Sequence, residues 1–378
     1  MRVMISCGEA SGDLYAGALA AALRVRQPDI QITGLGGPRL RAAGADLVGD
    51  LSAFAVTGMT GALRLVPRSL QLIDRLRQDA RARRPDVLVV VDAPDFNFPL
   101  IWALRSLRIP VVYYISPQLW AWRAGRMASI KRHAARVLVI FPFEEALYRD
   151  AGVPVQFIGH PLVELSTPLQ SRAQFRAAVP GSPESPIVAL LPGSRRNEIR
   201  RIAPVMAASL PIIRARVPGV RFVVAAAPAL DDAEFLPLAA EGARIIRGST
   251  DDVLQGSDVA MTASGTATVQ CALHERPMVV VYRMSGFDFR LLSRFVTVPH
   301  IAMPNLLAGQ RIVPELVQDD FTPQAAADAM VTLLTNADAH ARTVAALRSV
   351  REQLGGPGAS TRAADAVLAV ASEYYRRP

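Results

Sequence analysis

The chain has 378 residues, of which 51% are hydrophobic, and a formal net charge of +9. This length exceeds what one ordinary core accommodates, so we expect a well-packed globular protein of two domains. The two cysteines, Cys7 and Cys271, exclude a disulfide framework and are typical of small buried side chains in a reducing compartment.

Export and membrane-crossing segments are not expected. Charge interrupts the N-terminus at Glu9 and Asp13 before a full apolar segment develops, which argues against a signal peptide. The uncharged run 259–274 contains Ser, Thr and Gly and is shorter than the roughly 20 mostly apolar residues that a spanning helix needs. We therefore expect a cytoplasmic protein that contacts a membrane only from the side.

Two segments, 64–84 and 123–136, concentrate basic charge. The first has seven arginines against two aspartates, and the second has five cations and no acidic residue. Such clusters are typical either of a solvated helix face or of a surface that meets anionic lipid or phosphate. Both interpretations stay open at this point.

Short β-branched runs alternate with helix-period stretches along the whole chain. Apolar strands separated by helices predict a parallel sheet covered on both faces. In the first half we expect strands at residues 3–6, 30–34, 87–91, 111–115, 137–140 and 155–158. In the second half we expect strands at residues 187–191, 221–225, 244–246, 259–261 and 278–282.

The breaks between these runs predict the domain boundaries. The proline-rich segment 167–186 predicts a linker between a first domain, 1–166, and a second domain, 187–354. The sequence GGPG precedes a last helix at 359–375. We predict an α/β fold class with two Rossmann-like doubly wound domains facing across a ligand cleft, to which the carboxyl ends of the strands contribute binding loops.

The first candidate loop is GEASGD, residues 8–13, between a strand and a helix. A glycine-bearing turn in this position usually cradles phosphate, but Glu9 and Asp13 repel it. Asp92 ends the apolar strand 87–91 and is a candidate general base. It is equally compatible with a helix N-cap, since Ala-Pro follows it.

Two tryptophans, Trp120 and Trp122, follow the expected strand 111–115. Tryptophan is usually part of a core, but after a strand it can also stack on a sugar or cover an acyl chain. His160, in the sequence GHP, has no acidic partner nearby in the sequence.

The sequence LLPGSRRNEI, residues 190–199, opens the second domain. Gly193 and Ser194 predict an anion-binding turn at a helix N-terminus, and Arg195 adds a full positive charge. This combination suits a diphosphate leaving group without a metal ion. Glu198 lies in the first helical turn, where it favours the helix dipole or serves as a capping partner of Ser194.

The sequence ASGTATVQ, residues 263–270, is a second strand-to-helix turn. Ser264, Gly265, Thr266 and Thr268 offer hydroxyls and backbone N–H groups for phosphate, although an ordinary Ser/Thr N-cap has the same composition. Gln270 lies one turn further on, where it can hydrogen-bond a ribose or sugar hydroxyl. Two such loops in one domain are more specific than either alone.

A late polar cluster, MPNLLAG and VPELVQ, contains Asn305, whose amide can bind both phosphate and hydroxyl groups. The five histidines are scattered, and neither HxH nor CxxC occurs, so we expect no metal site. The chain also lacks GxGxxG, a P-loop and a GxSxG elbow, and we expect no cofactor.

Taken in order, the motifs GEASGD, DAPDFN, SPQLWAWR, FPFE, GHP, LPGSR, SGTAT, MPN and VPEL resemble those of lipid-A-disaccharide synthase. That family consists of inverting glycosyltransferases of the two-domain GT-B fold, and the resemblance covers the chain from residue 1 to about 354. It implies transfer of 2,3-diacylglucosamine from UDP to the C6 hydroxyl of 2,3-diacylglucosamine 1-phosphate (lipid X). The products are lipid A disaccharide 1-phosphate and UDP, in the lipid A biosynthesis of a Gram-negative bacterium.

The resemblance also implies roles for individual residues. Asp92 matches the proposed catalytic aspartate, and Glu9 matches a glutamate needed for activity and faces the acceptor sugar. Arg195 and Glu198 match residues of the nucleotide side, and Asn305 matches a further active-site residue.

The chain departs from the family pattern at two positions. Gln270 stands where the family usually has a glutamate that holds the ribose, and Gly61 stands where relatives commonly carry glutamate. We expect Gln270 to contact the ribose differently from a glutamate. How the chain contacts the acceptor near Gly61 stays open.

The implied protein is peripheral on the inner face of the inner membrane and needs no metal. Its helix at 359–378 packs back on the first domain, and a homodimer with exchanged C-terminal parts occurs among relatives. We expect residues 56–70 to contact an anionic membrane surface and the acyl chains of both substrates.

Three other functions fit parts of the pattern. Another UDP-N-acetylglucosamine transferase or epimerase of the same fold is disfavoured by the tryptophans and the basic surface, which do not suit a soluble acceptor. A two-lobed sugar-binding protein without catalytic activity would be expected to carry an export signal, which the N-terminal sequence does not favour. A nucleic-acid binder fits the sequence pI of 10.3, but basic composition alone is weak support, and we expect no nucleic acid.

Overall fold

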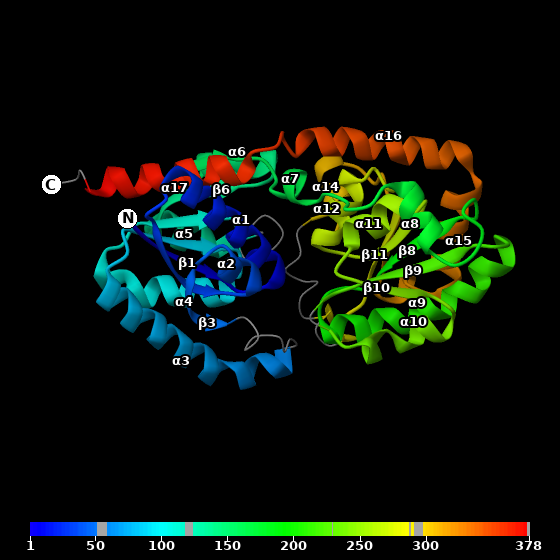
Figure 1. The fold of residues 1–378 in the computed structure, drawn as a ribbon, viewed down its shortest axis with the longest axis horizontal. Helices are drawn as coiled ribbons and strands as arrows, with labels where there is room; N and C mark the ends of the chain where they lie inside the picture. The colour runs from blue at the N-terminus through cyan, green and yellow to red at the C-terminus, as the bar shows by residue number, and fades with distance from the viewer. Residues whose placement is uncertain (51–58, 118–123, 229, 287–288, 291–297, 376–378) are drawn as a thin grey trace. The chain divides into compact units, whose positions relative to one another are not determined.

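The computed structural model describes residues 1–50, 59–117, 124–228, 230–286, 289–290 and 298–375. The chain forms two compact units (Figure 1). The first contains Met1–Pro161 and Leu354–Pro378, and the second contains Leu162–Arg294 and Val298–Gln353. Each unit is built around a parallel sheet, so the predicted α/β fold class with two doubly wound domains is confirmed.

The described part of the first unit has a sheet of seven parallel strands in the order β3-β2-β1-β4-β5-β6-β7. They are β1 (Arg2–Cys7), β2 (Gln31–Gly36), β3 (Asp46–Asp50), β4 (Val87–Val91), β5 (Val111–Tyr114), β6 (Ala134–Val139) and β7 (Val155–Phe157). The strand order reverses between β1 and β4. In such sheets the loops that follow the two strands at the reversal form the binding site.

Helices cover both faces of this sheet. They include α1 (Ala10–Arg26), α2 (Pro38–Ala42), α3 (Met59–Arg83), α4 (Pro94–Leu104), α5 (Met127–His133), α6 (Pro142–Asp150) and α17 (Ala359–Tyr375). The helix α17 packs against α1 and the central strands, whereas α3 packs against α4 (Figure 1). Leu76, Leu88 and Leu100 are buried together in the core between the sheet and the α3–α4 layer.

The described part of the second unit has six parallel strands in the order β10-β9-β8-β11-β12-β13. They are β8 (Ile187–Leu191), β9 (Arg221–Ala226), β10 (Arg244–Arg247), β11 (Val259–Ala263), β12 (Met278–Tyr282) and β13 (Glu315–Val317). Side chains of β8 alternate between two buried clusters, with Leu190 in one and Ala189 and Leu191 in the other. Both faces are therefore covered, and the order reverses between β8 and β11.

The helices of the second unit include a pair, α9 and α15, that pack against each other on one face of the sheet. The described helices of this unit include α7 (Leu162–Leu165), α8 (Arg172–Ala178), α9 (Arg196–Arg216), α10 (Leu236–Ala240), α11 (Thr250–Gly256), α12 (Thr266–Leu273), α14 (Met303–Ala308), α15 (Pro323–Thr335) and α16 (Ala337–Gln353).

Every strand predicted from the sequence is present, with ends shifted by a few residues, but β3 and β13 were not predicted. Both are edge strands. The sequence of β3, DLVGD, is only partly buried, and β13 has three residues, ELV. A strand paired on one side needs no uninterrupted apolar run, so the pattern that reveals central strands does not reveal these two.

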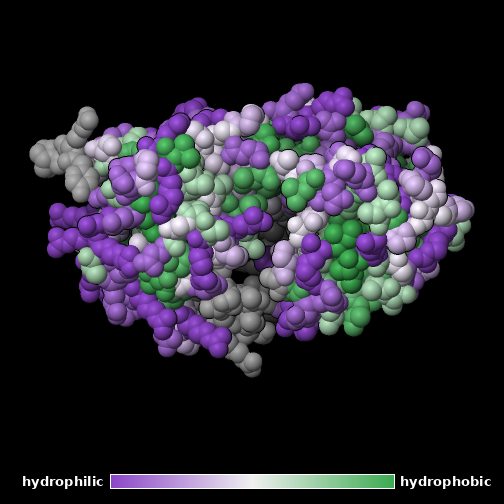
Figure 2. All heavy atoms as spheres, viewed as in Figure 1, coloured by the Kyte–Doolittle hydropathy of each residue, from purple (hydrophilic) through white to green (hydrophobic). Residues whose placement is uncertain are grey.

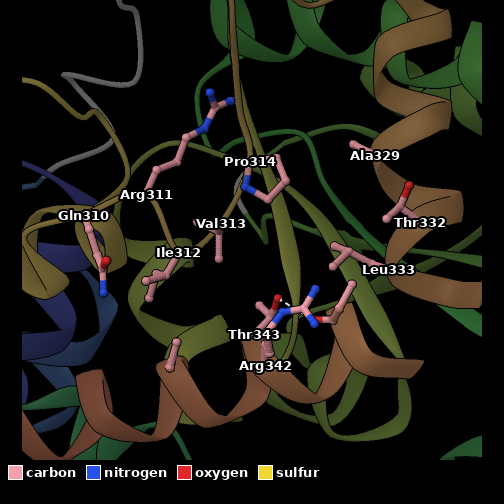
Figure 3. Close-up of a pocket in the computed structure, with 12 residues that line it drawn as sticks. Gln310, Arg311, Ile312, Val313, Pro314, Ala329, Thr332, Leu333, Arg342 and Thr343 are labelled. Carbon is pink, nitrogen blue, oxygen red and sulfur yellow. Dashed lines mark hydrogen bonds between the residues drawn. The ribbon is translucent and has the colours of Figure 1, made fainter. Parts of the chain in front are cut away.

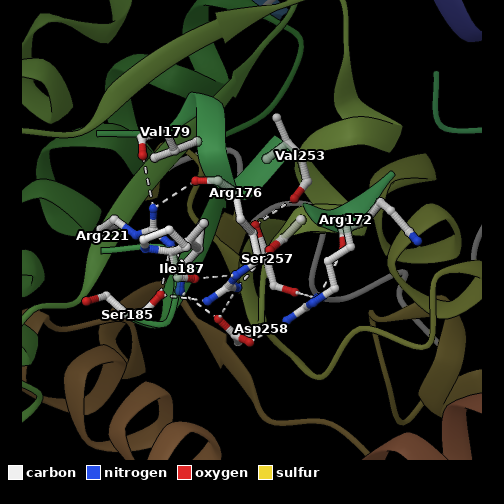
Figure 4. A network of polar contacts seen from close by, with 12 residues as sticks. Arg172, Arg176, Val179, Ser185, Ile187, Arg221, Val253, Ser257 and Asp258 are labelled. Atoms are coloured by element: carbon white, nitrogen blue, oxygen red, sulfur yellow. Dashed lines mark hydrogen bonds and ion pairs between the residues drawn. The ribbon is translucent and has the colours of Figure 1, made fainter. Parts of the chain in front are cut away.

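The prediction of a linker at 167–186 is wrong, because this segment is bound to the second unit. It contains α8, which begins with a capping box at Ser171. Asp258 accepts hydrogen bonds from Arg172 Nη2 (2.6 Å), Arg176 Nη1 (3.0 Å) and the N–H of Ile187 (2.7 Å) (Figure 4). Arg221 donates to carbonyl oxygens of the same segment, those of residues 176, 179, 183 and 185.

Both cysteines are buried and unpaired, as predicted, and burial raises the pKa of both thiols. Among the described helices, none is both long enough and apolar enough to cross a bilayer.

Candidate functional site

The loops after β1 and β4 meet at the strand-order reversal of the first unit. A Cβ added to Gly8 would lie 2.4 Å from the Cβ of Ala93, so the close approach of these loops requires glycine at position 8. Glu9 follows Gly8 and is exposed, and Asp92 precedes Ala93 and is half-buried. The two acids predicted to act on a sugar hydroxyl therefore lie on adjoining loops.

Asp92 lies in a strained turn. Its φ is +46° and that of Ala93 is +44°, a left-handed conformation that costs a non-glycine residue about 1–2 kcal/mol. The carbonyl oxygen of Asp92 accepts hydrogen bonds from Asn97 Nδ2 (2.7 Å) and from the Tyr113 hydroxyl (3.0 Å). Ala93, not Asp92, occupies the N-cap position of α4. Strain that is held in place at a binding loop is typical of functional residues.

The other acid of the GEASGD loop, Asp13, has a structural role. Its carboxylate is buried and accepts hydrogen bonds from the N–H groups of Gly37 (2.7 Å), Arg39 (2.9 Å) and Leu40 (3.1 Å) at the start of α2. A buried carboxylate at a helix N-terminus is stabilised by the free N–H groups and the helix dipole. Only Glu9 of this pair is presented to solvent.

His160 belongs to the core of the first unit. Its ring lies 6.0 Å from the ring of Tyr15 and 5.4 Å from that of Phe141, between centroids. Burial lowers the pKa of His160 to about 3. Its backbone N–H donates to the carbonyl oxygen of Leu354 (2.8 Å), where the chain returns to this unit.

The first predicted phosphate turn of the second unit follows β8. Gly193 has a φ of +120°, and Ser194 N–H donates to Glu198 Oε2 (3.2 Å). A Cβ on Gly193 would lie 2.2 Å from that carboxylate, so glycine is required for the turn to close over Glu198. Glu198 thus holds the backbone of the turn just before Arg195, the N-cap residue of α9. Arg195 is exposed at the N-cap position of α9.

The second predicted turn follows β11, the neighbour of β8. Gly265 has a φ of +138°, and apart from its chain neighbours no heavy atom of the described residues lies within 4 Å of a Cβ built on it. Ser264 Oγ donates to Ile301 O (2.8 Å), and Thr268 Oγ1 donates to Gly265 O (2.7 Å). Thr266 begins α12, whose first N–H groups have no acceptor within the helix. This turn is open and suited to an anion.

Gln270 is connected to a polar cluster beneath the second turn. Its Nε2 donates to Asp251 Oδ1 (3.3 Å), and the same oxygen lies 3.0 Å from His274 Nε2 and accepts a hydrogen bond from Ser166 Oγ. A glutamate at this position would place a second carboxylate beside Asp251. The amide is therefore the residue type that fits the surroundings of this chain.

The expectation that the Asn305 amide contacts a ligand does not fit its surroundings. Asn305 is fully buried, and its Oδ1 accepts from the N–H groups of Ile312 (2.8 Å) and Val313 (2.9 Å). Its Nδ2 donates to Val313 O (3.0 Å) and Glu315 Oε1 (2.7 Å). All four hydrogen-bonding positions of the amide are used inside the protein.

Glu315 links Asn305 to the open turn. Its carboxylate also accepts hydrogen bonds from the N–H groups of Ile301 (3.2 Å) and Ala302 (3.0 Å). Because Ser264 donates to the carbonyl of Ile301, Asn305 supports the turn at 264–266 through this loop.

The remaining residues singled out in the sequence lie either away from these loops or outside the residues that the structure describes. Trp120 and Trp122 lie outside the described residues, and Gly61 lies within α3. Within the described ranges, no group of three or more His, Cys, Asp or Glu side chains is placed to hold a metal ion.

A cavity of about 630 Å³ lies elsewhere in the second unit, before the start of β13 and beside α15 and α16 (Figure 3). Its lining includes Arg311, Val313, Leu333 and Arg342. In Figure 3 the arginine side chains do not point toward one another. None of the residues predicted to contact substrates lines this cavity.

Comparisons with known proteins cover nearly the whole chain. The family model described as lipid-A-disaccharide synthetase matches residues 3–370. Lipid-A-disaccharide synthase of Myxococcus xanthus (strain DK1622) is 41% identical over 97% of both chains. That of Geobacter metallireducens (strain ATCC 53774 / DSM 7210 / GS-15) is 40% identical over 97% of this chain and 96% of the relative.

Solved structures share the fold. A UDP-GlcNAc 2-epimerase from Neisseria meningitidis bound to UDP-GlcNAc has a TM-score of 0.70 at 14% identity, covering 98% of this chain and 100% of that one. CalG4, the calicheamicin glycosyltransferase, has a TM-score of 0.62 at 16% identity, covering 98% of both chains. At these identities the likeness shows the two-domain architecture of such enzymes and nothing finer.

Proposed function

Because the chain belongs to the lipid-A-disaccharide synthase family, it is a glycosyltransferase of lipid A biosynthesis, and we propose that it joins two acylated glucosamines. The donor is UDP-2,3-diacylglucosamine and the acceptor is lipid X. A bond forms between the acceptor O6 and the donor C1, the bond from C1 to the diphosphate oxygen breaks with inversion, and UDP leaves. The acceptor hydroxyl proton passes to a carboxylate of the protein.

We assign that carboxylate to Asp92. The observation that carries the assignment is the strained turn at the strand-order reversal, which holds a half-buried aspartate beside the exposed Glu9. A general base must reach only one hydroxyl, and a fixed backbone limits where its carboxylate points. Glu9 accepts hydrogen bonds from acceptor hydroxyls and orients the sugar.

The second unit supplies the site for UDP. The departing diphosphate is held by Arg195, by the turn at 193–195 and by the open turn at 264–266, where N–H groups at the start of α12 face negative charge. Gln270 contacts the ribose, and Asn305 keeps the open turn in place. We propose that these groups stabilise the leaving group without a metal ion.

The membrane-facing surface is assigned to α3 and α4, which pack against each other. Val66 and Leu70 on α3 are 49% and 60% exposed, and Trp102 on α4 is 61% exposed, with the Arg105 guanidinium over its ring. Hydrophilic side chains predominate in the region of Figure 2 where Figure 1 places α3. Apolar tips among arginines suit the headgroup region of an anionic membrane.

The reaction is tested with the variant Asp92→Asn. It should abolish formation of the disaccharide and leave UDP binding, measured by calorimetry, near that of the wild type. The control is Asp95→Asn, because Asp95 lies three residues further on, in the first turn of α4, and is exposed and paired with Arg126. Near-normal turnover by the Asp92 variant would remove Asp92 from the role of base.

The substrates are tested by incubation of the purified protein with UDP-2,3-diacylglucosamine and lipid X, followed by mass analysis. We expect one disaccharide 1-phosphate and one UDP per turnover, at the same rate with and without EDTA. Conversion of the donor to an epimer without disaccharide would contradict the proposed reaction. Loss of activity with EDTA would contradict only the metal-independent step.

The membrane surface is tested by liposome sedimentation. Leu70→Ser should weaken binding to vesicles that contain anionic lipid, whereas Leu236→Ser should not, because Leu236 is equally exposed, at 60%, but belongs to the second unit. Equal binding by both variants would place the membrane contact elsewhere.

A further inference from the structure

Asn97 is a buried amide with a specific set of partners. It lies in the first turn of α4 and is fully buried. Its Oδ1 accepts a hydrogen bond from Ser6 Oγ (2.8 Å), at the end of β1. Its Nδ2 donates to Asp92 O (2.7 Å) and lies 3.3 Å from Val91 O, at the end of β4. One side chain thus connects the two strands at the reversal of the sheet.

Tyr113 provides a second donor to the same carbonyl. Its hydroxyl lies 3.0 Å from Asp92 O, on the neighbouring strand β5. Burial, together with the charge of Asp92, raises the pKa of Tyr113 well above its ordinary value. The phenol therefore keeps its proton and donates, so the carbonyl of Asp92 receives two hydrogen bonds from buried groups.

The two hydrogen bonds act on a backbone that would otherwise relax. Asp92 and Ala93 have φ values of +46° and +44°, which L-residues adopt only when their surroundings hold them there. Relaxation of φ at Asp92 is a rotation about its N–Cα bond, which moves its Cα–Cβ bond and its carbonyl together and would break both hydrogen bonds. The two donors therefore oppose this rotation and hold the Cα–Cβ bond from which the carboxylate extends.

We propose that Asn97 is a positioning residue for the glycosyl transfer, which with Tyr113 holds the Asp92 turn in its reactive conformation. Ser6 sets the orientation of the amide, because its hydroxyl donates to Oδ1 and leaves Nδ2 directed at the carbonyls. The inference rests on the proposed function, since it assigns a task to the residue that supports the base.

The residue type at position 97 is restricted. An aspartate has no N–H group and would set a carboxylate against the carbonyl oxygens of Val91 and Asp92, whereas a leucine would leave both carbonyls and Ser6 without this partner. Only an amide of this length accepts from Ser6 and donates to both carbonyls.

The test compares steady-state kinetics of Asn97→Leu with those of Thr33→Val. Thr33 is also a buried polar residue of the first unit, with a hydroxyl that lies 3.2 Å from Asp79, so its loss controls for general destabilisation. Asn97→Leu should lower kcat about 100-fold, as displacement of a catalytic group by about 1 Å does, with KM for both substrates changed less than about threefold. Thr33→Val should keep kcat within about twofold of the wild type.

Milder variants keep the test decisive if Asn97→Leu does not fold. Tyr113→Phe and Ser6→Ala each remove one hydrogen bond, and each should lower kcat about fivefold at unchanged KM, the effect of one bond of about 1 kcal/mol. Unchanged kcat in both would overturn the proposal, as would equal loss of kcat in Asn97→Leu and Thr33→Val.

The outcome separates this inference from the proposed function. An inactive Asp92→Asn with a fully active Asn97→Leu would overturn the positioning role alone. A fully active Asp92→Asn would overturn the assignment of the base itself, whatever the Asn97 variant does.

Discussion

Replacement of His160 by glutamine should remove a pH-dependent contribution to the stability of the first unit. His160 is 2% exposed, and burial lowers its pKa to about 3, whereas an unfolded chain gives histidine a pKa of about 6.5. Between these values the unfolded state binds a proton that the folded state does not. Stability therefore falls with decreasing pH, by about 1.4 kcal/mol per pH unit once the pH is below about 6.5.

The contribution of His160 to the free energy of unfolding can be measured between pH 7 and pH 5. Integrated over this range, the contribution of His160 to the free energy of unfolding falls by about 2 kcal/mol. Urea unfolding followed by tryptophan fluorescence reports on the correct unit, because Trp102, Trp120 and Trp122 all belong to the sequence of the first unit. His160→Gln should lose about 2 kcal/mol less than the wild type between these two pH values.

A matched control separates this effect from the general acid sensitivity of the protein. Ser6→Ala removes a buried polar group of the same unit that does not titrate, and it should keep the pH dependence of the wild type. If His160→Gln and the wild type lose equal stability between pH 7 and pH 5, the reasoning from a buried neutral imidazole is refuted.

Three further substitutions test the packing around the candidate site. Gly8→Ala should lower kcat about 100-fold, because its Cβ would displace the Ala93 turn, and a crystal structure would show the shift. Asp258→Asn should lower the free energy of unfolding of the second unit by about 2–3 kcal/mol in urea, since two arginines lose their only carboxylate among the described residues. Asn305→Leu should raise the Kd for UDP in calorimetry and lower stability by about 3 kcal/mol, whereas unchanged UDP binding would exclude its support of the open turn.

The sequence predicts those parts of the fold that depend on local patterns. The five residues of β4, VLVVV, are all buried, and such a run in a chain of this composition is recognised without any tertiary information. The glycine turns after β8 and β11 can also be predicted from local sequence, because in each case the strand, the turn and the start of the helix follow one another along the chain. Edge strands such as β3 carry no comparable run.

The contacts that complete the candidate site are not visible in the sequence. Ser6 and Asn97 are 91 residues apart along the chain, and they meet only because β1 and β4 are neighbours in the sheet. Asn305 looks like a ligand-binding amide in a loop, yet its partners are the backbone groups that follow it. Its burial depends on how residues 301–315 fold over the second turn, which no local pattern specifies.

The two units present different loop residues on a similar sheet topology. The six strands of the second sheet follow the same order as the first six of the first sheet, which has β7 in addition, and in both the order reverses between the first strand of the unit and a later neighbour, β4 or β11. The loops at the first reversal present carboxylates, Glu9 and Asp92, whereas those at the second present Arg195 and the open Gly265 turn. Since the backbone arrangement is shared, the proposed division between a sugar-activating unit and a diphosphate-binding unit depends on these few loop residues. Exchange of Arg195 for glutamate should therefore raise the Kd for UDP without unfolding the second unit.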